Sequence, residues 1–241
     1  MIGTITCRNF AIWSLLLVAT PWVSAQRPPS ERPLRWAEGQ PGCTFSADDD
    51  GKYRYGLWTD DFGVVIAVDA LELEKANRRT EPTFAVQVTI RYRGKESMDV
   101  NPDRFSLEFV DHYHTVQPAL NPDDLSTALQ NDADAFIAES ERIIRKHPEK
   151  KSEKEVELKA FQKNIADMLG FLHDRTLKEA KLNATNPEVS GWLLFSARGK
   201  WIGQWNKQEK FVLRVPMGGL TMEFPFSLPP SKGDVLLRRR P

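Results

Sequence analysis

Residues 121–187 have the apolar spacing of helices, whereas the sequence on both sides of them alternates as β-strands do. A helix start is indicated by Asn121-Pro122-Asp123-Asp124, because Asn can cap free backbone N–H groups, proline fits the first turn and carboxylates favour the positive end of the helix dipole. The residue before a proline is pushed out of the α region, so His147-Pro148 should end this helix. Its apolar residues are Leu125, Leu129, Ala133, Phe136, Ile137, Ile143 and Ile144, with one weak turn at Ser140.

A second helix is expected to start at Pro148 or at Ser152, since Ser152 and Glu155 have the spacing of a capping box. Its apolar stripe advances by three and four residues alternately, which suits packing on another helix. Short connections make consecutive helices antiparallel, so we expect a helical hairpin that frays between His173 and Leu182 and ends by Asn186-Pro187. The stripe consists of Leu158, Phe161, Ile165, Met168 and Leu172.

Alternating runs around the insert predict about eight strands joined by turns, with no helix outside the insert. After the insert, Trp192-Leu193-Leu194-Phe195 is apolar on both faces and is predicted to be a central strand. A slip in the alternation at Leu71 and Leu73 predicts a bulge or a change of face. Turns are expected at Asp50-Gly51 and Gly218-Gly219. A last short strand is expected at Val235 to Arg238. The rows of side chains expected to face the core are Phe84 to Tyr92, Phe105 to Phe109 and Phe211 to Val215.

The late strand Phe211-Val212-Leu213-Arg214-Val215-Pro216, together with the order of the strands, resembles exported bacterial immunoglobulin-like domains. The resemblance covers roughly residues 64–238 without the insert and rests on patterning. It implies a mainly β fold with an α insertion, an immunoglobulin-like antiparallel β-sandwich interrupted by a helical hairpin. It carries over no functional residue, and the disulfide pair of antibody domains is absent from the sequence.

The first 25 residues have the pattern of a secretory signal, with Arg8 before an apolar run and Val23-Ser24-Ala25 as a cleavage site. The apolar run is too short to span a hydrocarbon core of ~30 Å, so we expect cleavage before Gln26 and no membrane span in the mature chain. The mature protein should therefore be periplasmic or extracellular. A proline-rich leader is expected at 26–42, followed by a single domain at 43–241.

The charge of the chain is balanced, with 33 Lys and Arg against 33 Asp and Glu. Removing the signal takes away Arg8 and leaves 32 against 33, a net charge of −1, which argues against a nucleic-acid partner. The mature chain keeps one cysteine, Cys43, so an internal disulfide is impossible. We expect Cys43 to be a small buried residue, with a disulfide between two chains as the alternative.

The sequence contains no catalytic, phosphate-binding or dinucleotide-binding motif, so we expect no enzyme, no catalytic residue and no cofactor. The candidate metal ligands are His112 and His114, which would share one face if the strand continued past them, with Asp111 nearby. Two ligands do not complete a site, so we expect an exposed strand end and no stoichiometric metal. Asp48 and Asp50 resemble the start of a calcium loop, but the closing Glu is missing, which favours a turn.

We expect an exported, non-catalytic module that binds a protein partner, because the hairpin exposes a surface that a minimal sandwich lacks. One alternative is an envelope enzyme or metal-binding protein that uses the His112/His114 edge, which a third ligand beside both histidines would favour. Another is a carbohydrate-binding module, which an aromatic row exposed on one sheet would favour. An uncovered apolar stripe on the hairpin would favour the protein partner. The aromatic candidates are Tyr53, Tyr55, Trp58, Trp192, Trp201 and Trp205.

Overall fold

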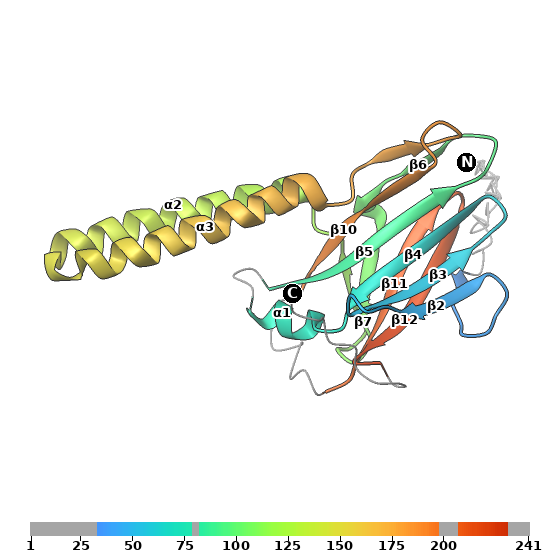
Figure 1. The fold of residues 1–241 in the computed structure, drawn as a ribbon, viewed down its shortest axis with the longest axis horizontal. Coiled ribbons are helices and arrows are strands. Elements are labelled where there is room, and N and C mark those ends of the chain that lie inside the picture. Colours follow the sequence, from blue (N-terminus) through green and yellow to red (C-terminus); the bar gives the residue numbers. More distant parts are fainter. Residues whose placement is uncertain (1–32, 79–81, 198–206, 231–241) are drawn as a thin grey trace, which may run out of the picture. The chain divides into compact units, whose positions relative to one another are not determined.

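Most of the described chain lies in β-strands, and the computed structural model describes residues 33–78, 82–197 and 207–230 (Figure 1). The expected signal at 1–25, the first part of the leader and the strand expected at 235–238 lie outside these residues. The described strands form two five-stranded sheets and one two-stranded sheet.

The two five-stranded sheets, which we call the β body, are antiparallel except where β1 joins β12 (Figure 1). The first sheet has the order β10-β5-β4-β3-β2 and the second the order β1-β12-β11-β7-β8. The first consists of β2 (Cys43–Ala47), β3 (Lys52–Trp58), β4 (Phe62–Asp69), β5 (Thr83–Tyr92) and β10 (Glu188–Ser196). The second consists of β1 (Leu34–Arg35), β7 (Ser106–Phe109), β8 (Thr115–Pro118), β11 (Glu209–Met217) and β12 (Leu220–Leu228). The small sheet pairs β6 (Met98–Val100) with β9 (Ala180–Leu182).

Alternate side chains of both sheets meet in one apolar core. Phe84 of β5 stacks on Phe211 of β11 with 4.8 Å between ring centroids, so the two sheets are joined by direct aromatic contact. Burying one such side chain contributes roughly 1.5–3 kcal/mol to folding. The three inward rows predicted by alternation are confirmed, with Phe84, Val86, Val88, Ile90, Phe105, Leu107, Phe109, Leu213 and Val215 fully buried and Phe211 and Tyr92 nearly so.

Both predicted glycine turns are confirmed. Gly51, with a φ of 76°, lies in the turn between β2 and β3. Gly218 and Gly219, with φ of 56° and 84°, form the two-residue connection between β11 and β12. Two successive positive φ angles match the right-handed twist of the paired strands, which is why glycine is favoured at both positions.

Strand β10 lies at the edge of its sheet, so the prediction that Trp192-Leu193-Leu194-Phe195 is central is wrong. Phe195 and Leu193 face the shared core, whereas Leu194 belongs to a second apolar cluster on the outer face, which helices cover. The edge of β10 that faces away from β5 is hydrogen-bonded to chain segments at the hairpin base, where Leu120 N donates to Leu194 O at 2.8 Å. A strand covered on both faces is apolar on both faces, whatever its position in the sheet.

The slip after β4, expected to be a bulge or a change of face, is instead a short helix, α1 (Glu72–Arg78). Asp69 Oδ1 accepts a hydrogen bond from Leu71 N at 2.9 Å and turns the chain at the strand end. Leu73 and Ala76, three residues apart, are then buried against the β body. A 3-10 turn, η1 (Pro102–Arg104), is a further helical element outside the insert. The expectation of no helix outside the insert is therefore wrong.

The insert forms a helical hairpin of α2 (Pro122–Lys146) and α3 (Lys151–Arg175), joined by η2 (Pro148–Lys150), as predicted (Figure 1). Asn121 Oδ1 caps α2 by accepting hydrogen bonds from Asp123 N at 2.9 Å and Asp124 N at 3.4 Å. The first helix ends at Lys146, with His147 as its C-cap immediately before the proline. Ser152 caps nothing, because η2 already starts the turn at Pro148 and α3 follows without a side-chain cap.

The helical part of the insert ends at Arg175, and residues 176–187 return to the sheets. Thr176 forms an isolated bridge with Trp192 of β10, and β9 pairs with β6. The inserted unit is therefore shorter than the expected 121–187.

The described part of the leader contributes to the β body. Leu34 and Arg35 pair with Met222 and Glu223 of β12, so the sheet begins before the expected domain start at residue 43. Cys43 is half-buried and packs against the core, and its Sγ accepts a hydrogen bond from Ala37 N at 3.5 Å.

Candidate functional site

The base of the hairpin is packed on the outer face of the first sheet. Leu129, Ile165 and Leu172 of the helices are buried together with Ala85 of β5 and Leu194 of β10. Phe171 contacts Trp192 with 6.1 Å between ring centroids. At the end of α3, Leu177 N donates to Trp192 O at 2.9 Å, so both ends of the hairpin are hydrogen-bonded to β10.

A cleft of about 330 Å³ lies where the hairpin joins the β body. Its polar side chains carry both signs of charge, with Asp103, Asp123 and Glu179 facing the same space as Lys178. The described residues contain no group of three or more His, Cys, Asp or Glu side chains placed to hold a metal ion. The Asn121 cap already uses the N-terminal N–H groups of α2.

The outer part of the hairpin, residues 137–160, contributes no residue to either apolar cluster that includes the sheets. We call this segment the arm. Phe136 and Phe161 contact each other at its inner boundary, with ring centroids 4.3 Å apart. Within the arm, Ser140 of α2 is also buried. The two helices therefore pack on each other at the point where the arm begins.

The surface of the arm is charged and mixed in sign. Arg142 pairs with Glu139 at 2.6 Å and Lys154 with Glu157 at 2.5 Å. Among the described residues of α2 and α3, Val156 is the one large apolar side chain that is exposed, at 68%. The uncovered apolar stripe that would favour a protein partner is therefore not found on the described hairpin.

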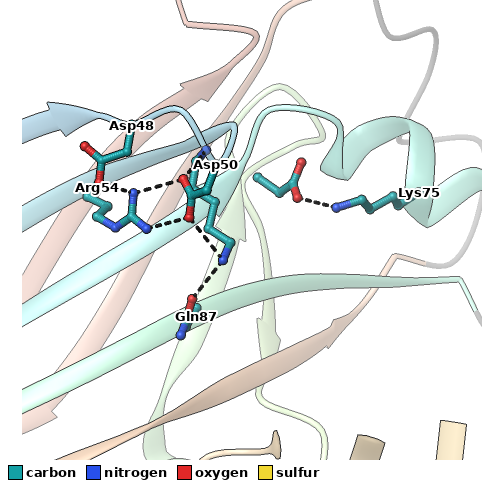
Figure 2. A network of polar contacts seen from close by, with 7 residues as sticks. Asp48, Asp50, Arg54, Lys75 and Gln87 are labelled. Carbon is teal, nitrogen blue, oxygen red and sulfur yellow. Dashed lines mark hydrogen bonds and ion pairs between the residues drawn. The ribbon is translucent and has the colours of Figure 1, made fainter. Parts of the chain in front are cut away.

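A polar network surrounds the Asp50-Gly51 turn (Figure 2). Arg54 pairs with Asp50 at 2.6 Å and with Asp48 at 2.5 Å, and the hydrogen bond from Arg54 lowers the pKa of Asp50 to about 2. Lys52 reaches Gln87 of β5 at 3.4 Å and lies over the ring of Trp192 at 5.5 Å. The carboxylates that resemble a calcium loop are thus turned toward cations of their own sheet, which agrees with a structural turn.

A second network crosses the outer face of the other sheet. Arg214 of β11 lies between Glu223 of β12, at 3.0 Å, and Glu108 of β7. Arg35 of β1 extends the row by pairing with Glu223 at 2.8 Å. Burial would raise the pKa of Glu108, but the hydrogen bonds from His114 and Arg214 outweigh it and hold that pKa below its usual range. The alternating charges join neighbouring strands in one register.

The two candidate histidines do not share a strand face. The chain turns between β7 and β8, with positive φ of 56° at Tyr113 and 55° at His114. His112 Nε2 lies 3.0 Å from Glu209 Oε2, whereas His114 Nδ1 lies 2.5 Å from Glu108 Oε1. The alternative of a His112/His114 edge required both imidazoles on one strand face, whereas each of them pairs with a different carboxylate.

The aromatic candidates do not form a row on one sheet. Tyr53 and Tyr55 are buried, Arg93 lies over Trp58 at 5.3 Å, and Trp192 is packed at the hairpin base. Trp201 and Trp205 lie outside the described residues. Sequence reasoning missed a different aromatic group, at Trp36 and Phe45, because Trp36 belongs to the segment that was expected to be a poorly ordered leader.

No protein-family model and no curated protein matches this chain. A solved structure from Bacillus subtilis, described as a "putative lipoprotein (ycdA)", aligns with a TM-score of 0.33 and 13% identity over 80% of this chain. The aligned part spans 40% of the Bacillus chain, and at that TM-score the likeness assigns neither a fold family nor a function. In the described part of the chain, neither long helix is apolar enough to cross a membrane.

Proposed function

We propose that this chain is an exported, non-catalytic interaction protein of the cell envelope or extracellular space, and that the arm binds a protein partner. One observation carries the proposal: residues 137–160 extend both helices well past the cluster that anchors the hairpin to the β body. The core of the β body is built without them. A segment with no role in the core is free to serve a partner.

Export and an immunoglobulin-like sandwich belong to the same proposal. The secretory pattern at 1–25 supports export, and the two mainly antiparallel sheets with one shared core support a sandwich. The meander of β2 to β5 within one sheet, followed by a crossing to the other sheet, also supports a sandwich.

The charged side chains of the arm suit a partner whose surface is polar. It carries six carboxylates and seven basic side chains, so charged contacts should guide association and make it sensitive to salt. Val156 offers one exposed apolar anchor. The charged residues are Glu139, Glu141, Glu149, Glu153, Glu155 and Glu157, with Arg142, Arg145, Lys146, Lys150, Lys151, Lys154 and Lys159.

A short-arm variant tests this proposal. Residues 137–160 are replaced by a short Gly/Ser loop, which keeps the Phe136–Phe161 contact and the whole hairpin base. The full chain and the variant are each used to capture partners from the native envelope extract, and binding of the captured protein is repeated with purified components. We expect the short-arm variant to lose the partner.

Tyr113→Asn is the matched control, because Tyr113 is fully exposed on the β7–β8 turn and Asn tolerates its positive φ. This variant should bind as the unmodified chain does. If the short-arm variant folds and binds the same partner with unchanged affinity, the binding surface lies on the β body and the arm is not the binding element.

A further inference from the structure

A groove of about 290 Å³ opens where β2 and β3 of one sheet meet β12 of the other, far along the chain from the arm. Four aromatic residues line it: Trp36, Phe45, Tyr55 and Phe226. The polar groups beside them are the carboxylate of Glu38 and the hydroxyl of Ser227. No Lys or Arg is among the described residues that line the groove, so it is not built for an anion.

The strand register builds the aromatic wall. Phe45 and Tyr55 are direct cross-strand partners, with ring centroids 5.2 Å apart. Trp36 meets Tyr55 edge to face at 5.0 Å, and its Nε1 donates to Thr44 O at 3.0 Å, which holds the indole in place. Phe45 remains 46% exposed although aromatic neighbours surround it. A fixed cluster of partly exposed rings is the usual floor and wall of a ligand site.

Tyr55 adds a phenol to the aromatic wall of the groove. Its side chain is nearly buried, at 5% exposure, and burial raises its pKa to about 12, so the hydroxyl stays protonated at neutral pH. Among the described residues, this hydroxyl is not one of the buried polar atoms that lack a hydrogen-bond partner. Because Tyr55 lines the groove, its protonated phenol is the type of group that can donate a hydrogen bond to a molecule bound there.

We propose that this groove binds a neutral polysaccharide chain. A sugar ring has a face of C–H groups that stacks on Trp36 and Phe45, while its hydroxyls both accept from Tyr55 and donate to Glu38. A proline-rich peptide would also suit aromatic walls, but it offers carbonyl acceptors and no N–H at proline, which leaves Glu38 unmatched. The groove is separate from the arm, so this inference does not depend on the protein partner.

The test is calorimetric titration of the full chain with three neutral probes, cellohexaose, chitohexaose and maltohexaose, and with decaproline. We expect at least one hexasaccharide to bind, with an affinity that does not change with salt, because the ligand is uncharged. Phe45→Ala should weaken that binding about tenfold or more by removing a stacking ring. Tyr55→Phe should weaken it about threefold to tenfold, since only the hydroxyl is lost.

The control variant is again Tyr113→Asn, which removes an exposed aromatic ring elsewhere and should leave binding unchanged. Thermal unfolding of each variant verifies that it is folded, and Tyr55→Phe keeps the packing of the ring. The proposal is overturned if none of the three hexasaccharides binds, or if Phe45→Ala and Tyr55→Phe both leave binding unchanged. Binding of decaproline without any hexasaccharide would assign the groove to a protein partner and overturn it as well.

Discussion

The β body and the hairpin bury their apolar residues in different ways. In the β body, Phe84, Phe109 and Phe211 come from different strands of two sheets and are almost fully buried together. The arm contributes no residue to the apolar clusters that include the sheets, and at its inner boundary Phe136 and Phe161 remain half-buried. The β body therefore depends on contacts between distant parts of the sequence, whereas the arm depends on local helix formation and one seam.

The largest expected effect is a difference between two matched truncations. Phe84→Ala should lower the free energy of unfolding by about 3–5 kcal/mol, because it removes a fully buried ring that contacts Phe109, Phe211 and Phe226. Phe136→Ala should cost less than about 2 kcal/mol, since its ring is half-buried and contacts Phe161 alone among aromatic residues described here. Urea unfolding of both variants measures the difference, and equal costs would show that the hairpin is part of the main core.

A smaller effect is expected at the start of the hairpin. Asn121→Ala removes the side-chain acceptor of two N–H groups and should cost about 1 kcal/mol. Asn121→Ser restores a capping oxygen and should recover most of that stability. If Asn121→Ala has no effect, contacts at the hairpin base, rather than the cap, determine where α2 begins.

The smallest expected effect is a difference in acid sensitivity. The pKa of Glu108 in the folded chain lies below its ordinary value of 4.5, so its contribution is fully present above that pH and is lost as the pH falls through the folded-state pKa. Glu108→Gln should lower stability by roughly 1 kcal/mol or less above pH 4.5 and converge with the unmodified chain in acid.

Glu139 on the arm is the matched control for Glu108. Its pKa is also lowered, by a hydrogen bond from Arg142, but its side chain is exposed and solvent screens the pair. Urea unfolding from about pH 7 to about pH 3 should therefore show a flatter profile for Glu108→Gln and an unchanged one for Glu139→Gln. If the pH profile of stability changed equally in Glu108→Gln and Glu139→Gln, the acid sensitivity would not come from the network of Glu108, Arg214 and Glu223.

Local chemistry predicted the hairpin well, because Asn121, Pro122 and Pro148 act on their own neighbours. The position of β10 could not be predicted from its apolar pattern, since the second apolar face is covered by the hairpin, a contact between distant segments. Helix α1 was missed because seven residues are too few for a helical period to stand out, and Leu71 and Leu73 continue the strand alternation.

The candidate sites were less predictable than the fold. The histidine edge depended on a strand that continues, and the positive φ angles at Tyr113 and His114 occur at residues whose types do not require them. The aromatic groove joins Trp36, Tyr55 and Phe226, which come from three separate parts of the chain. The sequence named Tyr55 as an aromatic candidate, but only strand pairing places it beside Phe45.

Unfolding of the short-arm variant tests the central claim, that the β body with the hairpin base is a complete folding unit and the arm is an addition to it. Replacing 121–187 as a whole would also remove β9 and the bridge from Thr176, so the shorter replacement of 137–160 is the sharper test. Thermal unfolding followed by circular dichroism should show less helix and a single cooperative transition close to that of the full chain. A variant that is unfolded, or that melts without cooperativity, would show that the arm stabilises the β body and would contradict the claim.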